Sequence, residues 1–367
     1  MDLSYLRKKI DGLDAKIIEL LNDRANIALS IGHEKIKNSK PIYAPDREQD
    51  VLKRIKVLNR GPIKNEAVDA IYREIMSATL NLEKPLRIAY MGPEATFSHL
   101  ASLKKFGASV EHVACDNVAE VFGKVESGDC DYGVVPIENS IEGVVTHTMD
   151  LLVESDLKIC SQVLLNVTHN LMSPPLAPSK SVGQAGQASG SLSQIKEVYS
   201  HPQILGQCRQ WLLKNMPKAH LIPVVSSTKA AQMVAGKKNA ACIASQIAAP
   251  LYGLTILKKN IQDSTHNITR FLVISTMDVP PTGLDRTSLV FSIKDKVGAL
   301  HAMLTPFMRH KINLTKIESR PSKKKAWDYY FFVDCEGHQS DPRVARALAQ
   351  LEGMCKFLKI LGSYPDA

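Results

Sequence analysis

With 367 residues, the chain is too long for one ordinary hydrophobic core, and its length predicts two or three domains. Its 44% hydrophobic and 23% charged residues are typical of a soluble globular protein. No apolar run reaches the roughly 20 residues of a membrane helix, and the charged N-terminus lacks a signal-peptide core, so we expect a cytoplasmic protein. The net charge of +9 is spread along the chain. Binding of small anionic substrates explains this positive charge as well as binding of nucleic acid does. Because the basic residues are spread out, we expect neither a nucleic-acid nor a membrane partner.

The seven cysteines stand singly along the chain, without a Cys-x-x-Cys pair or a clustered set of histidine and cysteine. This spacing favours small buried side chains over a disulfide framework or a metal site. We expect neither a metal nor a cofactor.

Apolar residues recur at helical spacing over Leu3–Lys37, which predicts a helix of about 50 Å. Two shorter helices are predicted over Pro45–Leu58 and Asn65–Leu82. Because so long a helix cannot bury its own apolar stripe, we expect a dimer in which the long helices of two subunits pack together.

Polar residues on these helices suggest a shared site. On a helical wheel, Arg24 and Lys35 lie within roughly 20° of each other, whereas Arg7 lies about 100° from Arg24. Arg7 of a second subunit could therefore complete a site that one straight helix cannot. Charged residues on a helix are usually a solvated face when they are taken singly. As a set, they resemble the pattern of helical, AroQ-type chorismate mutases at Arg7, Arg24, Lys35, Arg47, Glu48, Thr79 and Glu83.

This resemblance implies the pericyclic rearrangement of chorismate to prephenate, which needs orientation and charge stabilisation but no nucleophile. It implies that Arg24 and the arginine from the second subunit hold the carboxylates. Lys35 and Glu83 would face the ether oxygen, where Glu83 donates a hydrogen bond only when it is protonated. Arg47 and Glu48 would position the ring hydroxyl.

The middle of the chain is organised around an apolar run over residues 132–135, predicted to be a strand that ends at Pro136. A polar cluster at residues 138–140, a glycine and a helical pattern follow. This order presents side chains and free N–H groups at the carboxyl end of a strand, although an ordinary capped turn has the same order.

Similar polar loops recur at residues 92–98, 198–203, 226–228 and 260–271, each next to a predicted strand or helix. Strands that alternate with helices in this way predict two α/β lobes with a cleft between them. Type II periplasmic binding proteins share this architecture, so the fold alone does not separate a receptor from an enzyme.

Three motifs of this segment resemble those of prephenate dehydratases: Gly-Pro-x-x-Thr-Phe-Ser, Pro-Ile-Glu-Asn-Ser, and Thr269-Arg270-Phe271 after Asn-x-x-Asp-Ser-x-x-Asn. The resemblance implies loss of CO₂ and hydroxide from prephenate to give phenylpyruvate. Thr269 would donate to or orient the leaving hydroxyl, and Arg270 would bind a carboxylate. A proton relay through water or Glu138 stays open, as do structural or acid roles for two histidines, His201 and His266.

The same resemblance places further residues in the dehydratase cleft. The implied catalytic residues include Glu138, Asn139, Ser200, Gln207 and Phe271, and the implied substrate-binding residues are Thr96, Ser98, Ser140, Ser227 and Thr228. Residues 174–193 depart from the family pattern, because they are rich in Pro, Gly, Gln and Ser and show no periodicity. We expect a flexible surface insertion there that does not touch the chemistry.

The last segment predicts the order strand, helix, strand, strand, helix, strand over residues 286–293, 298–309, 313–319, 328–336, 341–352 and 357–364. This order is typical of a ferredoxin-like α+β fold. Its Gly-Ala-Leu and Glu-Ser-Arg-Pro motifs resemble the ACT domain, which implies a phenylalanine site at a subunit interface; a plain dimerisation domain is the alternative. The implied binding residues are Gly298, Ala299, Leu300, Asn313, Leu314, Glu318, Ser319, Arg320 and Pro321.

From end to end the chain resembles the bifunctional chorismate mutase–prephenate dehydratase family. We therefore expect an all-α dimeric mutase domain at 1–84, a two-lobed α/β dehydratase domain at 86–276 and an ACT domain at 285–367. The resemblance implies conversion of chorismate through prephenate to phenylpyruvate, feedback inhibition by L-phenylalanine, and a homodimer or tetramer. The alternatives are a phenylalanine sensor or solute-binding protein built on decayed enzyme domains, and an enzyme with one live activity.

Overall fold

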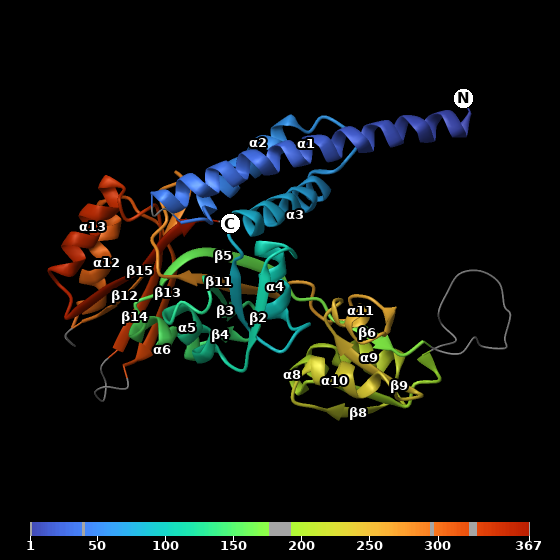
Figure 1. Ribbon diagram of the computed structural model, residues 1–367. Coiled ribbons are helices and arrows are strands. Elements are labelled where there is room, and N and C mark those ends of the chain that lie inside the picture. The colour runs from blue at the N-terminus through green and yellow to red at the C-terminus, as the bar shows by residue number, and fades with distance from the viewer. Residues whose placement is uncertain (1, 39–40, 176–191, 294–296, 323–328, 367) are drawn as a thin grey trace.

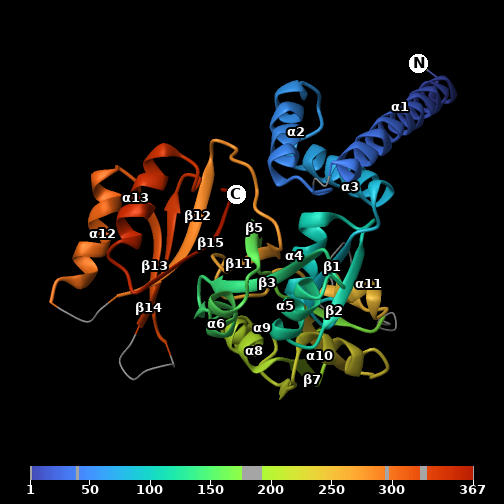
Figure 2. The same cartoon turned by 60° about the vertical axis from the view of Figure 1, so that its left-hand side comes forward.

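The computed structural model describes residues 2–38, 41–175, 192–293, 297–322 and 329–366. Three parts follow one another along the chain: a helical part, a two-lobed part with one sheet per lobe, and a sheet covered by two helices (Figures 1 and 2). Residues 176–191, which hold most of the predicted insertion, lie outside the described residues. In the described part of the chain, no helix is long and apolar enough to cross a membrane.

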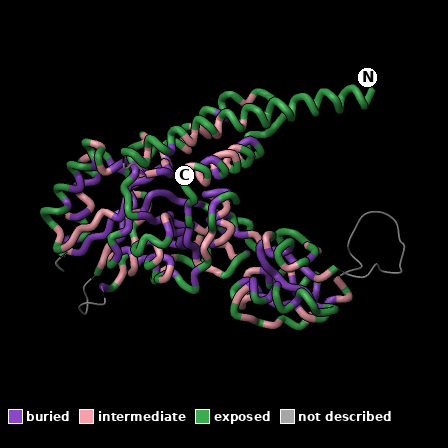
Figure 3. The backbone as a smooth tube through the Cα atoms, viewed as in Figure 1, coloured by how far each residue is buried: buried purple, intermediate pink, exposed green. Residues whose placement is uncertain are grey.

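The helical part consists of α1 (Leu3–Lys37), α2 (Pro45–Leu58) and α3 (Asn65–Glu83), which confirms the three predicted helices. Helix α1 is packed on α3 near its C-terminal end, where a Cβ on Gly32 would lie 2.9 Å from Glu83. Its N-terminal half projects away from the rest of the chain and is coloured as exposed in Figure 3. Gly32 is the only buried residue of α1.

The first lobe has a six-stranded sheet in the order β2-β1-β3-β11-β5, with β4 paired to β3. Its strands are β1 (Arg87–Met91), β2 (Glu111–Cys115), β3 (Tyr132–Asn139), β4 (Gly143–Val144), β5 (Lys158–Asn166) and β11 (Ile268–Ser275), and its helices are α4 (Phe97–Phe106), α5 (Val118–Glu126) and α6 (Thr146–Glu154). Strand β11 is antiparallel to both of its neighbours, so the chain returns from the second lobe into the middle of this sheet.

The second lobe has a five-stranded sheet in the order β10-β6-β9-β7-β8. Its elements are β6 (Asn170–Ser173), β7 (Glu197–Ser200), α8 (Pro202–Gln207), α9 (Arg209–Asn215), β8 (His220–Pro223), α10 (Ser227–Val234), β9 (Ala240–Ala244), α11 (Ala248–Leu251) and β10 (Thr255–Lys258). The chain passes between the lobes twice, after β5 and after β10. Two α/β lobes are therefore joined by two crossings, as predicted.

Strand β3 does not end at Pro136, where the sequence predicted a stop; it continues to Asn139. A proline has no N–H to offer a sheet, but the pairing with β11 is irregular at this point, because Phe271 lies opposite Pro136 and Arg270 opposite Glu138. The register shift accommodates the proline. Consequently the polar cluster after Pro136 begins on the strand itself.

The C-terminal part confirms the predicted βαββαβ order, with the sheet order β13-β14-β12-β15 of a ferredoxin-like fold. Its elements are β12 (Asp285–Ser292), α12 (Ala299–Arg309), β13 (Leu314–Pro321), β14 (Tyr329–Glu336), α13 (Pro342–Glu352) and β15 (Phe357–Pro365). Leu289 and Phe291 on one face of β12 pack in the core beneath the two helices. Val290, on the other face, shares a core with Ile137 and Ile159 of the first lobe. The sheet is thus packed on both faces.

Candidate active sites

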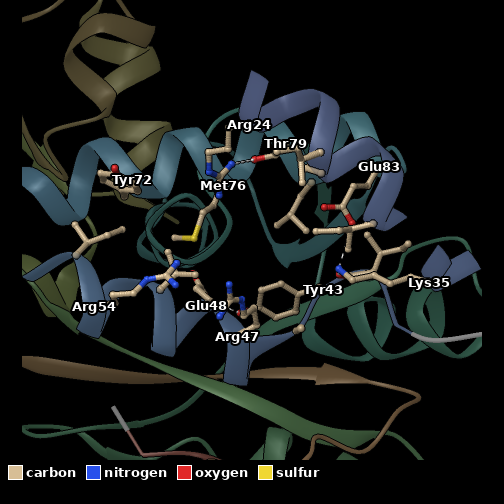
Figure 4. A pocket seen from close by; sticks show the side chains of 18 of the residues that line it. Arg24, Lys35, Tyr43, Arg47, Glu48, Arg54, Tyr72, Met76, Thr79 and Glu83 are labelled. Carbon is tan, nitrogen blue, oxygen red and sulfur yellow. Dashed lines mark hydrogen bonds and ion pairs between the residues drawn. The ribbon is translucent and has the colours of Figure 1, made fainter. Parts of the chain in front are cut away.

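The three N-terminal helices surround a cavity of about 770 Å³ (Figure 4). Side chains from α1, α2, α3 and the segment before α2 line it. Six of the seven residues predicted for the first site are among its lining: Arg24, Lys35, Arg47, Glu48, Thr79 and Glu83. Residues separated widely in sequence therefore meet around one space large enough for a small organic acid.

Three contacts hold the cationic side of this cavity. Arg24 Nη1 donates to Thr79 Oγ1 at 2.8 Å. Lys35 Nζ lies 3.2 Å from Glu83 Oε2 and donates to the carbonyl of Ile42 at 2.6 Å. Each contact joins α1 to α3 or to the α1–α2 connection, so the positive groups are held by tertiary contacts.

Glu48 is held from two sides. Tyr43 OH donates to Glu48 Oε2 at 2.7 Å, and Lys105 Nζ donates to the same oxygen at 2.9 Å. Burial and the neighbouring Glu48 carboxylate raise the pKa of Tyr43 well above its usual value. Tyr43 therefore keeps its proton near neutral pH and remains a donor.

Sequence reasoning missed four labelled residues of this cavity: Tyr43, Arg54, Tyr72 and Met76 (Figure 4). A signal for Arg54 was present, because it follows Arg47 by two helical turns and so lies on the same face of α2. Nothing in the local pattern distinguished the other three from ordinary core residues.

Arg7 does not line the cavity of its own chain. It lies on the exposed N-terminal half of α1, among large apolar side chains that are largely open to solvent. These include Leu3, Leu6, Ile10, Leu13 and Ile17, which have exposed fractions of 39% to 59%. An exposed apolar stripe of this length is typical of an interaction surface.

In the two-lobed part, Asn139 on β3 and Thr269 on β11 face each other across the sheet. The backbone N–H groups of Ile141 and Glu142 donate to Asn139 Oδ1 at 2.9 and 3.0 Å. Asn139 Nδ2 consequently faces Thr269 and donates to its Oγ1 at 2.8 Å. Thr269 therefore accepts this bond and retains its own hydroxyl hydrogen for another partner.

Asn139 and Thr269 are connected to a series of hydrogen-bonded amide side chains at the cleft between the lobes. Asn139 Nδ2 also donates to Asn267, and Asn267 Nδ2 donates to Gln207 Oε1 at 3.0 Å. Gln207, from the second lobe, donates in turn to Glu142 Oε1 at 3.0 Å. A cavity of about 480 Å³ lies beside these amides. It is lined by Ile141, Glu142, Gln203, Gly206, Gln207, Gln262, Asp263, Ser264 and Asn267.

His169, which sequence reasoning did not single out, contacts a residue of this cleft cavity but does not itself line it. Its Nε2 lies 2.8 Å from Gln207 Oε1, and burial lowers its pKa below the usual value. Neutral His169 thus donates to Gln207. His201 and His266, the two histidines considered from the sequence, are not among the lining residues of the cleft cavity.

Several predicted dehydratase residues have structural partners. The Ser200 hydroxyl is fully buried and donates to the Ile243 carbonyl at 2.7 Å. Thr96 caps α4, and the Thr228 hydroxyl donates to the Glu94 carbonyl of the other lobe at 3.1 Å. Ser98, Ser227 and Phe271 are also buried, whereas the Ser140 hydroxyl joins β3 to the backbone before β11.

Arg270 does not point into the cleft as a free carboxylate clamp. Neighbouring residues of a strand face opposite sides, so Thr269 and Arg270 diverge. Arg270 is buried, and its guanidinium bonds Gln162 at 2.8 Å, Asp334 at 2.6 Å and Tyr364 at 2.8 Å, the last two from the C-terminal sheet. All three guanidinium nitrogens thus have protein partners, and the binding of a substrate carboxylate by Arg270 stays a prediction.

Glu138 belongs to the same interdomain cluster. It accepts from Arg270 Nη1 at 3.0 Å and from Lys316 Nζ of β13. Burial alone would raise the pKa of Glu138, but the charges of Lys316 and Arg270 outweigh it and hold that pKa below its usual value. Glu138 is therefore ionised at neutral pH and carries no proton to relay.

The residues predicted to bind phenylalanine fall into two groups in one chain. Strand register places Arg320 and Ser292 opposite the same residue, Tyr330, so the Glu-Ser-Arg-Pro end of β13 lies near the start of α12, where Gly298, Ala299 and Leu300 lie. Asn313 and Leu314 lie at the opposite end of β13. Arg320 moreover pairs with Asp150 on α6 of the first lobe.

All seven cysteines are unpaired, and six are buried, as the sequence predicted for small core side chains. Burial raises the thiol pKa of Cys160 and Cys242 to about 12, so both remain protonated. In the part of the chain that the structure describes, no cluster of three or more His, Cys, Asp or Glu side chains could hold a metal ion.

Profiles of three known families match the chain in order: chorismate mutase type II over residues 6–84, prephenate dehydratase over 88–279 and the ACT domain over 287–353. The bifunctional chorismate mutase/prephenate dehydratase of Aquifex aeolicus is 48% identical over 370 residues, covering 100% of this chain and 98% of that one.

Solved structures resemble about three quarters of the chain. Prephenate dehydratase from Arthrobacter aurescens, in complex with L-Phe, has a TM-score of 0.67 at 32% identity and covers 77% of this chain and 90% of its own. GqqA, described as a novel type of quorum-quenching acylase, has the same TM-score of 0.67 at 28% identity and covers 77% and 98%. The two-lobed fold therefore does not by itself define one activity.

The full-length likeness and the three matched families define the class, a multidomain enzyme with a mutase, a dehydratase and an ACT domain. The chain belongs to the bifunctional chorismate mutase/prephenate dehydratase family. The resemblance found in the sequence motifs is confirmed.

Proposed function

We propose that the helical cavity rearranges chorismate to prephenate and that the interlobe cleft converts prephenate to phenylpyruvate. The observation that carries this proposal is the convergence of Arg24, Lys35, Arg47 and Arg54 with Glu48 and Glu83 around one cavity. Such a set matches a dianionic substrate that also carries a hydroxyl and an ether oxygen.

In the rearrangement, the protein holds the folded conformer of chorismate and stabilises charge on the breaking ether oxygen. Arg24, oriented by Thr79, binds one carboxylate, and Arg7 of a second copy binds the other. Lys35 donates to the ether oxygen, and Glu83, paired with Lys35, lies beside it. Glu48 accepts from the ring hydroxyl.

In the dehydratase step, Thr269 donates a hydrogen bond to the leaving hydroxyl of prephenate, which departs as hydroxide while the carboxylate is lost as CO₂. The bond from Asn139 Nδ2 supports this direction, because it uses the acceptor side of Thr269 Oγ1. The lining of the cleft cavity contains amide side chains but no Lys or Arg. We therefore assign the carboxylates of prephenate to N–H and O–H donors, with Gln207 among them.

Within one chain, Gly298 and Asn313 lie at opposite ends of the ACT sheet. We therefore infer that phenylalanine binds between the ACT domains of two copies. The proposed limits of the functional units are 1–84, 86–276 and 285–367. A homodimer formed through the exposed stripe of α1 completes the mutase cavity, and we place the enzyme in the cytoplasm.

The direct test is phenylpyruvate formation from chorismate by the purified chain, with and without phenylalanine. We expect product that decreases as phenylalanine rises. Product from prephenate but not from chorismate would limit the helical part to dimerisation. The absence of product from either substrate would favour a phenylalanine sensor.

A further inference from the structure

Lys105 belongs to α4 of the dehydratase lobe, yet its ammonium bonds Glu48, a residue that lines the mutase cavity. Lys105 Nζ and Tyr43 OH bond the same oxygen, Glu48 Oε2, at 2.9 and 2.7 Å. The Lys105 and Glu48 side chains retain only 18% and 15% of their exposure, so water screens the pair weakly. Within the described residues no donor bonds Glu48 Oε1, which leaves that oxygen available to a ligand.

The position of Lys105 is set by close packing of α4 against α3. Gly107 has a φ of +72°, and a Cβ added there would lie 2.5 Å from Ser77 Cβ on α3, so this approach requires glycine. The next residue, Ala108, donates its N–H to Glu74 Oε2 at 3.0 Å. Because these contacts follow Lys105 directly in the chain, a closely packed interdomain junction presents its ammonium to Glu48.

We propose that Lys105 is a positioning residue for the mutase reaction, supplied by the dehydratase domain. Together with Tyr43 it fixes Glu48 Oε2, so that Oε1 is oriented toward the ring hydroxyl of chorismate. An acceptor held by two donors loses less conformational freedom on binding than one held by a single donor. This inference rests on the proposed role of Glu48, and it makes the mutase cavity incomplete without the neighbouring domain.

The test uses the full-length chain with Lys105→Met, which keeps an unbranched side chain of nearly the same length and removes its charge. The matched control is Lys104→Met on the same helix, because Lys104 is exposed and donates to the Leu164 carbonyl, away from the cavity. We expect Lys105→Met to raise KM for chorismate about tenfold with kcat within about twofold, as for an interaction equal in ground and transition states. Dehydratase turnover of added prephenate should be unchanged, and Lys105→Arg should restore most of the loss.

A double-mutant cycle separates this role from a general effect on the fold. In a Glu48→Gln background, Lys105→Met should cause no further rise in KM, because its target is already gone. Additive effects of the two substitutions would overturn the proposal. The proposal would also be overturned if Lys105→Met had the same kinetic constants as Lys104→Met while Glu48→Gln weakened the mutase. If Glu48→Gln itself changes neither KM nor kcat, the proposed role of Glu48 fails, and the role of Lys105 fails with it.

Discussion

The direction of single hydrogen bonds decides which residues of the dehydratase cleft can donate a proton. Asn139 is oriented by two backbone N–H groups, so its amide donates to Thr269 and leaves the threonine hydrogen free. Glu138, the adjacent residue, has its oxygens on Lys316 and Arg270 and stays ionised. Two neighbours on one strand therefore serve different parts of the molecule, because strand side chains alternate between faces.

Removing the hydroxyl of Thr269 tests its role in the dehydratase step. Thr269→Val keeps the shape of the side chain, and we expect kcat with prephenate to fall about 100-fold, the range typical of losing one positioned hydrogen-bond donor to developing negative charge. Thr269→Ser should retain activity within about tenfold. Mutase turnover of chorismate in the same preparations serves as the control. A Thr269→Val enzyme with wild-type dehydratase kcat would exclude contact with the leaving hydroxyl.

Among the helices and strands, α1 is the element whose apolar surface a single chain leaves uncovered. Its C-terminal half carries Arg24 and Lys35 into the cavity, whereas its N-terminal half carries Arg7 and an uncovered apolar stripe away from it. At about 1.5 Å of rise per residue, Arg7 lies roughly 25 Å along the axis from Arg24. An antiparallel second copy of α1 would bring its Arg7 to this cavity, which is how a long amphipathic helix buries its stripe.

Subunit complementation tests this arrangement. Arg7→Met and Arg24→Met homodimers should each lose most mutase activity, since neither has a site with both arginines. Co-expression of the two variants should recover about a quarter of the wild-type activity, because half of the dimers are mixed and one of their two sites is intact.

The control for complementation is co-expression of Arg7→Met with the double variant Arg7→Met/Arg24→Met. No site in that mixture contains both arginines, so no activity should return. Full activity of the Arg7→Met homodimer would show that the cavity needs no residue from a second copy.

At the scale of the whole molecule, the ACT sheet is joined to the first lobe by both apolar and charged contacts. Val290 and Leu361 share a core with Ile137, and Lys316 reaches Glu138 on the strand that carries Asn139. A ligand that shifts the ACT sheet thus acts on a strand of the cleft. Inhibition requires phenylalanine to prefer the less active state, and a 100-fold preference corresponds to about 2.7 kcal/mol.

Breaking the contact between Lys316 and Glu138 should weaken this coupling. We expect Lys316→Met to raise the phenylalanine concentration for half-inhibition of the dehydratase about tenfold, equivalent to about 1.4 kcal/mol of lost coupling. Without phenylalanine, dehydratase activity should be retained, since Glu138 still pairs with Arg270. Arg343→Met, on the outer face of α13, removes the same charge and should leave inhibition unchanged. Unaltered inhibition in Lys316→Met would place the coupling elsewhere, for example at Arg320 and Asp150.

The sequence alone determined the family, the order of the three parts, the three N-terminal helices, and the βαββαβ order at the C-terminus. Local periodicity and caps specify such elements, and motifs of adjacent residues identify families. The resemblance to helical chorismate mutases also selected six residues that meet in the mutase cavity.

Only the tertiary structure decided which partner each polar group takes. It continues β3 through Pro136, turns Arg270 toward the ACT sheet, and brings Lys105 of one domain to Glu48 of another. These contacts join residues more than 50 positions apart, and each depends on how separate elements pack. Sequence periodicity describes one element at a time, so it cannot show which face of a neighbouring domain will meet that element.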